Sequence, residues 1–166
     1  MWFGLVTALI ASMALAQVPA TQPATRPAKS QAELDADFAA MLSNATLDGS
    51  YVSTGRGGDL SRLSTDKYTL GTVNKLAGKI WIIRARIGYG QNEMLLPLPL
   101  PVEWAGDTPV IVVDNLTIPG MGTFNARVMF FADHYSGYWS HGARGGILFG
   151  VVRRAAAGAP TTQPGR

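Results

Sequence analysis

The sequence predicts an all-β protein, in which about eight antiparallel strands form a meander that closes into a small barrel after one short N-terminal helix. Apolar and polar residues alternate along most of the chain after Leu47, which is the period of strands with two different faces. Turn signals rich in glycine and proline separate these runs at short intervals. No second helical period intervenes, so the crossovers that parallel strands need have no room. A β-sandwich of two sheets is the alternative.

The composition favours a single turn-rich domain. The chain has 166 residues, of which 47% are hydrophobic and 15% charged, and it contains 19 Gly and 10 Pro. The formal net charge of +3 comes without a dense run of Lys and Arg, so we expect no nucleic-acid partner. Because the chain has no cysteine, disulfides, thiolate metal ligands and a cysteine nucleophile are excluded.

The first 16 residues, MWFGLVTALIASMALA, resemble a secretory signal peptide. Their apolar stretch from Trp2 to Ala11 is too short to span a bilayer as an ordinary helix. Ala14-Leu15-Ala16 supplies the small–x–small pattern that signal peptidase reads, which predicts cleavage before Gln17. An uncleaved anchor is the alternative, because this segment has no Lys or Arg. We expect an exported protein, periplasmic or secreted, with no stable membrane span after cleavage.

Three further segments follow the predicted signal peptide. Residues 17–30 are rich in Pro, Thr and Ala, a composition typical of an extended, disordered spacer. Residues 31–154 hold the predicted helix and barrel. Residues 155–166 have the same character as the spacer and are predicted to form a disordered tail. A signal, a Pro- and Thr-rich spacer and a compact β domain in this order are typical of secreted bacterial proteins.

The predicted helix covers residues 31 to about 43. Ser30 and Glu33 fit the S-x-x-E capping box that begins many helices. The apolar residues that follow recur at the spacing of one helix face, and they are Leu34, Phe38, Met41 and Leu42. This stripe must cover other apolar groups, and one mouth of the barrel is a suitable place.

The strands are expected near residues 49–54, 67–76, 79–87, 94–104, 108–117, 123–131, 135–140 and 146–153. Alternation predicts which side chains share a face: Trp81, Ile83, Ala85 and Ile87 in one strand, Phe124, Ala126, Val128 and Phe130 in another, and Tyr68, Leu70, Thr72 and Leu76 in a third. Closure removes exposed strand edges. A barrel of this size is either filled by side chains or holds one small ligand.

The segment LPLPLPVEW, from Leu96 to Trp104, places its leucines on one face and its prolines on the other. Proline has no N–H, so Pro97, Pro99 and Pro101 remove hydrogen-bond donors toward one side of the strand only. We expect this strand to pair with one neighbour and to leave its other edge poor in donors, where the barrel is split. A polyproline ligand for a partner domain is the alternative.

The stretch HYSGYWSHGARGGILFG, from His134 to Gly150, contains both histidines of the chain. Alternation puts His134 and His141 on opposite faces of a strand, so they cannot bind one metal ion together. We interpret the stretch as the closing hairpin, in which Gly150 leaves space for the ring of Trp139 or Tyr135. We assign no catalytic residue, no cofactor and no metal ligand.

The arginines that alternate with apolar residues are Arg84, Arg86 and Arg127. Facing outward they would keep the sheet soluble, whereas facing inward they would form an anion-binding pocket. The outward orientation is the expectation, because charged side chains are rarely buried.

Two short motifs, Gly137-Tyr138-Trp139 and Gly49-Ser50-Tyr51, resemble the glycine–x–aromatic signature of calycin barrels, the group of lipocalins and avidins. The lipocalin signature lies on the first strand after a short helix, where this chain has Tyr51 in place of the usual tryptophan. The resemblance implies an eight-stranded barrel that binds small apolar molecules. Fold analogy alone does not establish such a function.

The sequence therefore favours a secreted or periplasmic barrel that binds a small apolar or amphipathic ligand without transforming it. The aromatic residues expected to line its interior and bind the ligand are Trp81, Trp104, Tyr135 and Trp139. The alternative is a structural or interaction protein of the cell envelope, with a filled barrel, no ligand and a protein partner. An exposed apolar patch on the outer wall would favour that alternative. An enzyme is the third hypothesis.

Overall fold

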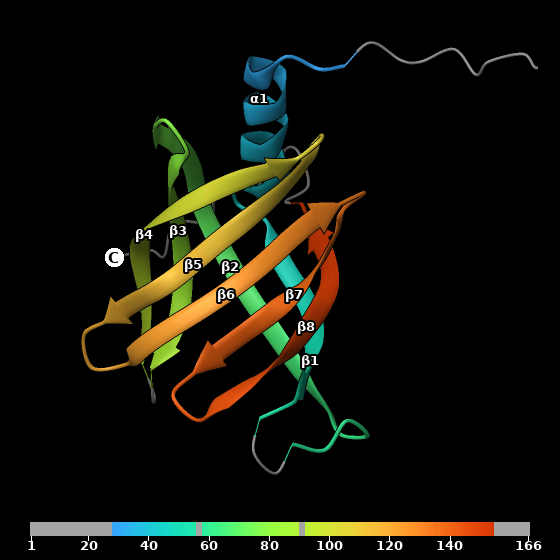
Figure 1. Cartoon of the computed structure of the whole chain (residues 1–166). Coiled ribbons are helices and arrows are strands. Elements are labelled where there is room, and N and C mark those ends of the chain that lie inside the picture. Colours follow the sequence, from blue (N-terminus) through green and yellow to red (C-terminus); the bar gives the residue numbers. More distant parts are fainter. Residues whose placement is uncertain (1–27, 56–57, 90–91, 155–166) are drawn as a thin grey trace, which may run out of the picture.

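In the computed structural model, the chain forms a closed barrel of eight antiparallel strands with one helix at its end, as the sequence predicts (Figure 1). The structure describes residues 28–55, 58–89 and 92–154, so the predicted signal peptide, most of the predicted spacer and the predicted tail lie outside the described residues. The elements are α1 (Gln31–Leu42), β1 (Thr46–Ser53), β2 (Leu63–Ala77), β3 (Ile80–Tyr89), β4 (Asn92–Ala105), β5 (Thr108–Ile118), β6 (Gly122–Phe131), β7 (His134–His141) and β8 (Arg144–Arg153).

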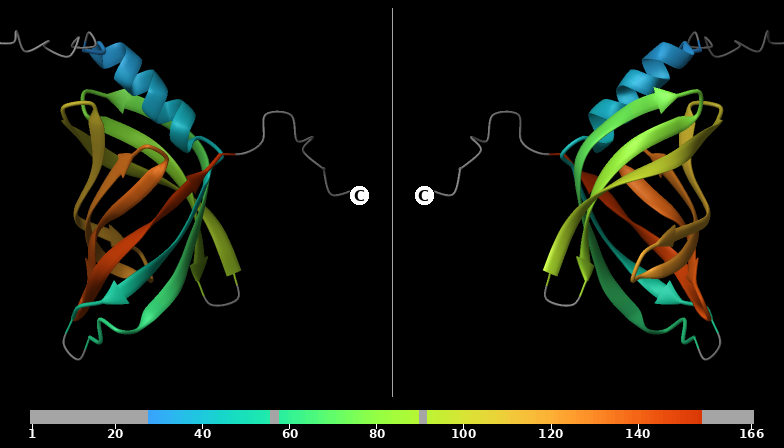
Figure 2. Two further views of the ribbon diagram at one scale, coloured as in Figure 1. Left: turned by 90° about the vertical axis from the view of Figure 1, so that its right-hand side faces the viewer. Right: turned by 90° about the vertical axis from the view of Figure 1, so that its left-hand side faces the viewer.

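Each strand pairs with the next one along the chain, and β8 pairs with β1 to close the barrel. The closing pair runs from Thr46↔Arg153 to Ser53↔Gly146 without a register shift. The predicted order of strands is confirmed, and the alternative of a two-sheet sandwich is wrong because the sheet has no free edge. Figure 2 shows α1 at one end of the barrel and the carboxyl ends of β1 and β3 at the other.

The helix α1 begins at the predicted capping box. The hydroxyl of Ser30 accepts the N–H of Glu33 at 3.4 Å, and the carboxylate of Glu33 accepts the N–H of Ser30 at 2.8 Å. Both N–H groups would otherwise have no partner at the helix start. Within the described ranges, no helix has the length and hydropathy that crossing a membrane requires.

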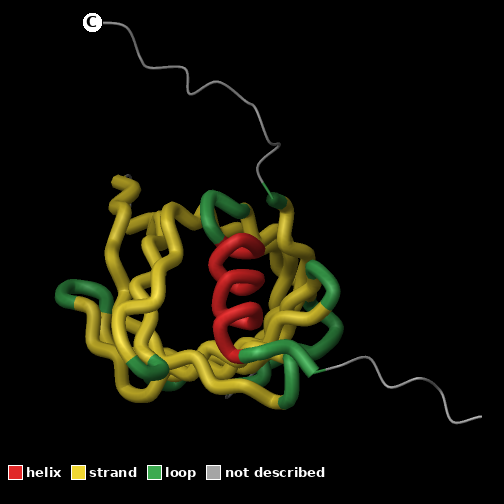
Figure 3. Tube along the Cα trace, turned by 90° about the horizontal axis from the view of Figure 1, so that it is seen from above, coloured by secondary structure: helices red, strands yellow, loops and turns green. Residues whose placement is uncertain are grey.

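The apolar stripe of α1 plugs the upper mouth of the barrel. Leu34, Phe38 and Leu42 are buried, and Phe38 is only 1% exposed. The Phe38 ring meets Trp81 edge-on, with ring centroids 4.9 Å apart, and lies about equally near Trp104 and Phe130, at 6.1 and 6.2 Å. Seen from above, the helix lies over the opening of the ring of strands (Figure 3). The core of the upper half is therefore formed jointly by the helix and the inner wall.

A β-bulge in β2 fastens the helix to the barrel. The pairing of β2 with β3 shifts register between Leu70 and Val73, which frees backbone groups from the ladder. The turn after α1 uses these groups. The hydroxyl of Ser43 accepts the N–H of Val73 at 3.1 Å, and the N–H of Asn44 donates to the carbonyl of Gly71 at 2.9 Å.

The same bulge overturns one predicted face. An inserted residue moves all later side chains of a strand to the opposite face. Leu70 and Val73 are consequently both buried, whereas Thr72 and Leu76 are exposed. The expectation that Thr72 and Leu76 share a face with Leu70 is therefore wrong, because strict alternation does not hold through the bulge.

The strands β3 and β6 alternate as predicted. On β3, Trp81, Ile83 and Ala85 are buried, while Arg84 and Arg86 are exposed. On β6, Phe124, Ala126, Val128 and Phe130 pack in or against the core, while Arg127 is exposed. The predicted outward orientation of the arginines is confirmed, so they form no anion-binding pocket inside the barrel.

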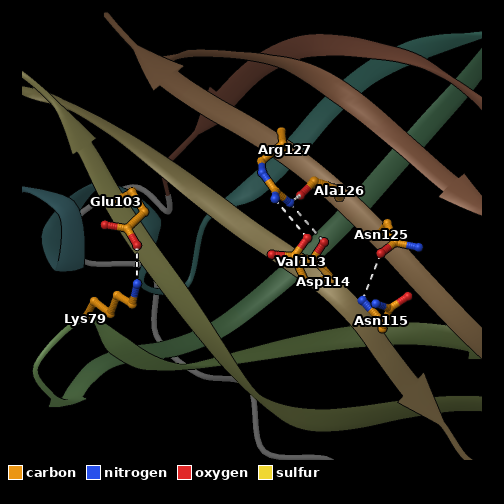
Figure 4. A network of polar contacts seen from close by, with 8 residues as sticks. All are labelled: Lys79, Glu103, Val113, Asp114, Asn115, Asn125, Ala126 and Arg127. Carbon is orange, nitrogen blue, oxygen red and sulfur yellow. Dashed lines mark hydrogen bonds and ion pairs between the residues drawn. The ribbon is translucent and has the colours of Figure 1, made fainter.

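Arg127 braces a second bulge, between β5 and β6 (Figure 4). Its guanidinium donates to the carbonyls of Val113 and Ala126, at 3.1 and 2.9 Å, and pairs with the carboxylate of Asp114 at 2.8 Å. Next to it, Asn115 has a positive φ of 50°, and its N–H donates to the side chain of Asn125 at 2.8 Å. Side chains therefore replace the ladder bonds that the bulge removes.

The prolines of β4 point their nitrogens away from β3. The N–H of Val102 donates to the carbonyl of Lys79, on the β3 side, at 2.8 Å. Alternate residues of a strand point their N–H groups to the same side. The nitrogens of Pro97, Pro99 and Pro101 therefore point toward β5, and none of them carries a hydrogen.

The pairing of β4 follows from these missing donors. β4 pairs with β3 over ten residue pairs but with β5 over only four, from Val102↔Ile111 to Ala105↔Thr108. The prediction holds for residues 96–101, which pair with β3 alone, whereas residues 102–104 pair with β5. The expectation that the barrel is split at this segment is wrong, because these pairs close the sheet between β4 and β5. We call the line between residues 95–101 of β4 and 112–118 of β5 the β4–β5 seam.

Candidate functional site

A cavity of about 450 Å³ lies inside the barrel. Side chains from all eight strands line it, together with Leu42 at the end of α1. Most of the lining is apolar and includes Leu47, Leu70, Ile83, Leu100, Val113, Phe130 and Leu148. The polar residues of the lining are Tyr51, Asp66, Tyr68, Asn125 and Tyr135. The interior is therefore not filled by its own side chains.

Tyr135 and Asp66 face each other across two glycines. The register places Tyr135 of β7 opposite Gly150 of β8, Gly150 opposite Gly49 of β1, and Gly49 opposite Asp66 of β2. A Cβ on Gly150 would lie 2.7 Å from Cε1 of Tyr135, and a Cβ on Gly49 would lie 2.4 Å from the Tyr135 hydroxyl oxygen. The ring therefore lies flat along the wall. The prediction that Gly150 leaves space for a large ring is confirmed, and the ring is Tyr135.

Burial shifts the pKa values of Asp66, Tyr68 and Tyr135. Burial raises the pKa of Asp66 above its ordinary value of 3.8, against the smaller opposing effects of hydrogen bonds from the Tyr68 hydroxyl and the Lys67 N–H. Burial, and then the hydrogen bond to Asp66, raise the pKa of Tyr68. Burial and the charges of Asp66 and Asp48 raise the pKa of Tyr135 to about 12. The tyrosines thus remain neutral at physiological pH.

Two groups of this cluster have unmet interactions. The hydroxyl of Tyr135 is buried and has no hydrogen-bond partner among the described residues. Asp66 likewise forms no ion pair with any residue that the structure describes, although it can carry a negative charge inside an apolar cavity. The Tyr135 hydroxyl is thus a buried polar group without a partner, which is costly and commonly marks a place where a ligand binds, whereas Asp66 is half-buried and lacks only a partner of opposite charge.

The four aromatic residues proposed from the sequence divide among three places. Tyr135 and Trp139 line the cavity, and Trp139 also packs edge-on against Tyr51 at 5.8 Å between ring centroids. Trp81 is buried beneath Phe38 in the upper core and does not line the cavity. Trp104 lines a separate groove of about 360 Å³ between α1 and the rim of the barrel.

The groove beside α1 is a weaker candidate. Its charged residues are largely paired with each other: Lys29 with Asp37 at 2.6 Å, and Arg154 with Asp133 at 2.5 Å. These pairs lie at the surface, where ion pairs contribute little and attract ligands weakly. The remaining charged residue of the groove, Asp107, is exposed to water, so the described lining offers no buried charge that needs a partner from a ligand.

The histidines lie apart, as predicted. His141 stacks on Phe124, with ring centroids 4.4 Å apart and planes 14° apart, while His134 is exposed and its Nδ1 lies 2.7 Å from the carbonyl oxygen of Ala132. Within the part of the chain that the structure describes, no group of three or more His, Asp or Glu residues could hold a metal ion. The site is thus a cavity with one carboxylate and several phenols.

Neither Asp66 nor Tyr68 was predicted as a site residue, although alternation placed Tyr68 on the face of Leu70. Both share the parity of the buried residue Leu70, and this parity was the signal that could have found them. The sequence indicated Tyr51 only as part of a glycine–x–aromatic motif, and not as a residue of the site.

Comparisons with known proteins identify no relative. The chain matches no protein-family model, no curated protein and no solved structure. The resemblance to calycin barrels therefore stays a prediction.

Proposed function

We propose that this protein binds a small apolar or amphipathic molecule inside its barrel and does not transform it. The cavity of about 450 Å³ carries this proposal. Small-molecule sites commonly measure about 300–1,000 Å³ and combine an apolar lining with a few convergent polar groups. The inner wall has this character, with one polar cluster around Asp66 in an otherwise apolar surface. The signal-like residues 1–16 favour a role in the periplasm or outside the cell.

The plug suggests how a ligand would reach the cavity. Phe38 and Leu42 close the upper mouth with buried side chains, so access there requires displacement of α1. Residues at the lower ends of the strands, such as Tyr51 and Ile118, and Met121 of the turn after β5, line the other side of the cavity. We therefore expect a ligand to enter from the end opposite the helix.

Binding of the neutral hydrophobic dye Nile red tests this proposal. We expect saturable binding with one dye per protein and a blue-shifted emission. Ala126→Phe adds bulk to the inner face of β6 and should abolish binding, whereas Met129→Trp adds bulk to the outer face and should not. Equal binding to both variants would show that the dye binds outside the barrel. Native mass spectrometry of protein from its own host would then identify any molecule that copurifies.

A second candidate function is contact with another protein through the outer wall of the barrel. The outer wall of β6–β8 exposes a set of large apolar side chains, which are Met129, Phe131, Tyr138, Ile147 and Phe149. Tyr138 and Ile147 are register partners, and Met129 and Phe149 are the partners of Ser136 on its two sides. Gathered apolar side chains on a soluble surface favour contact with another protein. Tyr138→Ser with Phe149→Ser should then abolish recovery of a partner from an envelope fraction, and recovery of no partner by the unmodified protein would refute this candidate.

A further inference from the structure

Asp66 differs from the other carboxylates in its surroundings. Asp48, on the neighbouring strand, faces outward and pairs with Arg153 at 2.7 Å, and Asp114 and Glu103 pair with basic residues in the same way. Asp66 faces the cavity and forms no ion pair with any described residue. Asp66 is half-buried, so its charge is partly removed from water and is stabilised by a partner of opposite charge, which a bound ligand can supply.

Aromatic side chains surround this carboxylate. Tyr51, Tyr68, Tyr135 and Trp139 line the same cavity, and Tyr68 lies two residues from Asp66 on the same face of β2. Tyr135 reaches toward Asp66 only because Gly49 and Gly150 leave the wall flat between them. Faces of aromatic rings attract cations, and cages of such rings bind ammonium groups. A carboxylate among phenol rings therefore favours a cation over an anion.

The rest of the cavity suits an apolar tail. Away from Asp66, the lining consists of aliphatic and aromatic side chains such as Leu100, Val113 and Phe130. A ligand with a charged head and an apolar body would thus match both parts of the cavity. An anionic head would instead meet the negative charge of Asp66 with no described basic side chain in the lining to offset it.

We propose that the ligand is an amphipathic amine, whose ammonium group pairs with Asp66 among the tyrosine rings and whose apolar tail fills the upper cavity. This inference rests on the proposed function, since it assigns a ligand class to the same cavity. Asp66, Tyr51, Tyr68 and Tyr135 are its recognition residues.

Calorimetric titration with three ligands of equal chain length tests the inference. The probes are decyltrimethylammonium, decanol and decyl sulfate, each below its micelle concentration, added to protein purified from cells that express the full chain. We expect the cation to bind more tightly than decanol, by on the order of tenfold or more. Asp66→Asn should remove this preference and leave decanol binding unchanged. Asp48→Asn, which removes the same charge from the outer face, should preserve it.

The outcomes separate the inference from the proposed function. Binding of none of the three ligands would overturn both. Binding of decanol with no preference for the cation, or tighter binding of decyl sulfate, would overturn the amine assignment and leave the proposed function standing. Carbon NMR of the Asp66 carboxyl provides a second measurement on the unmodified protein. Its resonance should move on addition of the cation, and an unmoved resonance with a bound cation would also overturn the assignment.

Discussion

The ring of Tyr135 lies against Gly150 so closely that a Cβ on residue 150 would be 2.7 Å from Cε1 of the ring. The same Cβ would lie 2.5 Å from the carbonyl oxygen of Asp48, which belongs to the backbone and cannot turn away. The absence of a side chain at residue 150 therefore permits two contacts at once, the pairing of β8 with β1 and the packing of Tyr135.

Gly150→Ala should consequently destabilise the barrel. Overpacking of a tight site typically costs about 1–3 kcal/mol, because the neighbours must shift. Urea unfolding measures the loss. Gly71→Ala is the control, since its nearest contact would be the Cβ of Arg84 at 3.2 Å, and it should cost clearly less. Equal losses in the two variants would contradict the account of Gly150.

Phe38→Ala should weaken the plug. Phe38 is 1% exposed and packs between Trp81, Trp104 and Phe130, so its removal leaves a cavity beneath α1. Such truncations of buried phenylalanine cost about 3–5 kcal/mol. Thermal and urea unfolding should show this loss, while Gln31→Ala, on the exposed side of the same helix, should change stability by less than about 0.5 kcal/mol. A small effect of Phe38→Ala would mean that α1 does not depend on this contact.

Asp66 should make stability depend on pH. Burial raises its pKa in the folded protein above the 3.8 of an ordinary aspartate, so the folded state holds this proton more firmly than the unfolded state. The free energy of unfolding therefore falls as the pH rises from 3.8 through the folded-state pKa. Asp66→Asn lacks this titration and should gain stability relative to the unmodified protein over the same range.

Urea unfolding of both proteins without ligand, at several values from about pH 3 to about pH 7, measures this difference. The titratable groups that act on Asp66 or on its tyrosine neighbours are Tyr51, Tyr68, Tyr135 and Asp48, and all are present in both proteins. A constant difference in stability across the range would show that Asp66 is not desolvated.

Arg127 should contribute more to stability than an ordinary surface ion pair. Its guanidinium bonds two carbonyls at the β5–β6 bulge as well as Asp114. Arg127→Lys keeps the charge but cannot keep this geometry, and we expect a loss of about 1 kcal/mol. Lys79→Gln breaks an exposed pair with Glu103 and should cost less than about 0.5 kcal/mol. Equal losses would show that the carbonyl contacts contribute nothing beyond the charge.

Local patterns predicted much of the fold. The capping box at Ser30, the missing donors of Pro97, Pro99 and Pro101, and the space left by Gly150 each depend on residues a few positions apart or on one strand pair. Those features follow from backbone geometry, which the sequence specifies directly.

The candidate site depended on relations that no local pattern contains. Trp81 and Trp104 share the inward parity of Tyr135, but parity does not say how high along the barrel a residue lies or that Phe38 fills that level. Parity with Leu70 places Asp66 on the inner face, but only the strand register aligns it with Tyr135 across three strand pairs. Alternation along each strand therefore predicted which residues face inward, whereas the register between strands determines which of these residues lie close together.

The proline run of β4 also determines how this barrel can deform. Widening a closed barrel breaks hydrogen bonds between some pair of strands, and β4 and β5 share only four residue pairs, beside the β4–β5 seam, where the closing pair β1–β8 has eight. Opening fluctuations should therefore occur mainly between β4 and β5. The barrel can widen there while the other strand pairs stay intact. Leu98 and Leu116 line the cavity on the two sides of this line, so widening at the seam would open the side wall of the cavity.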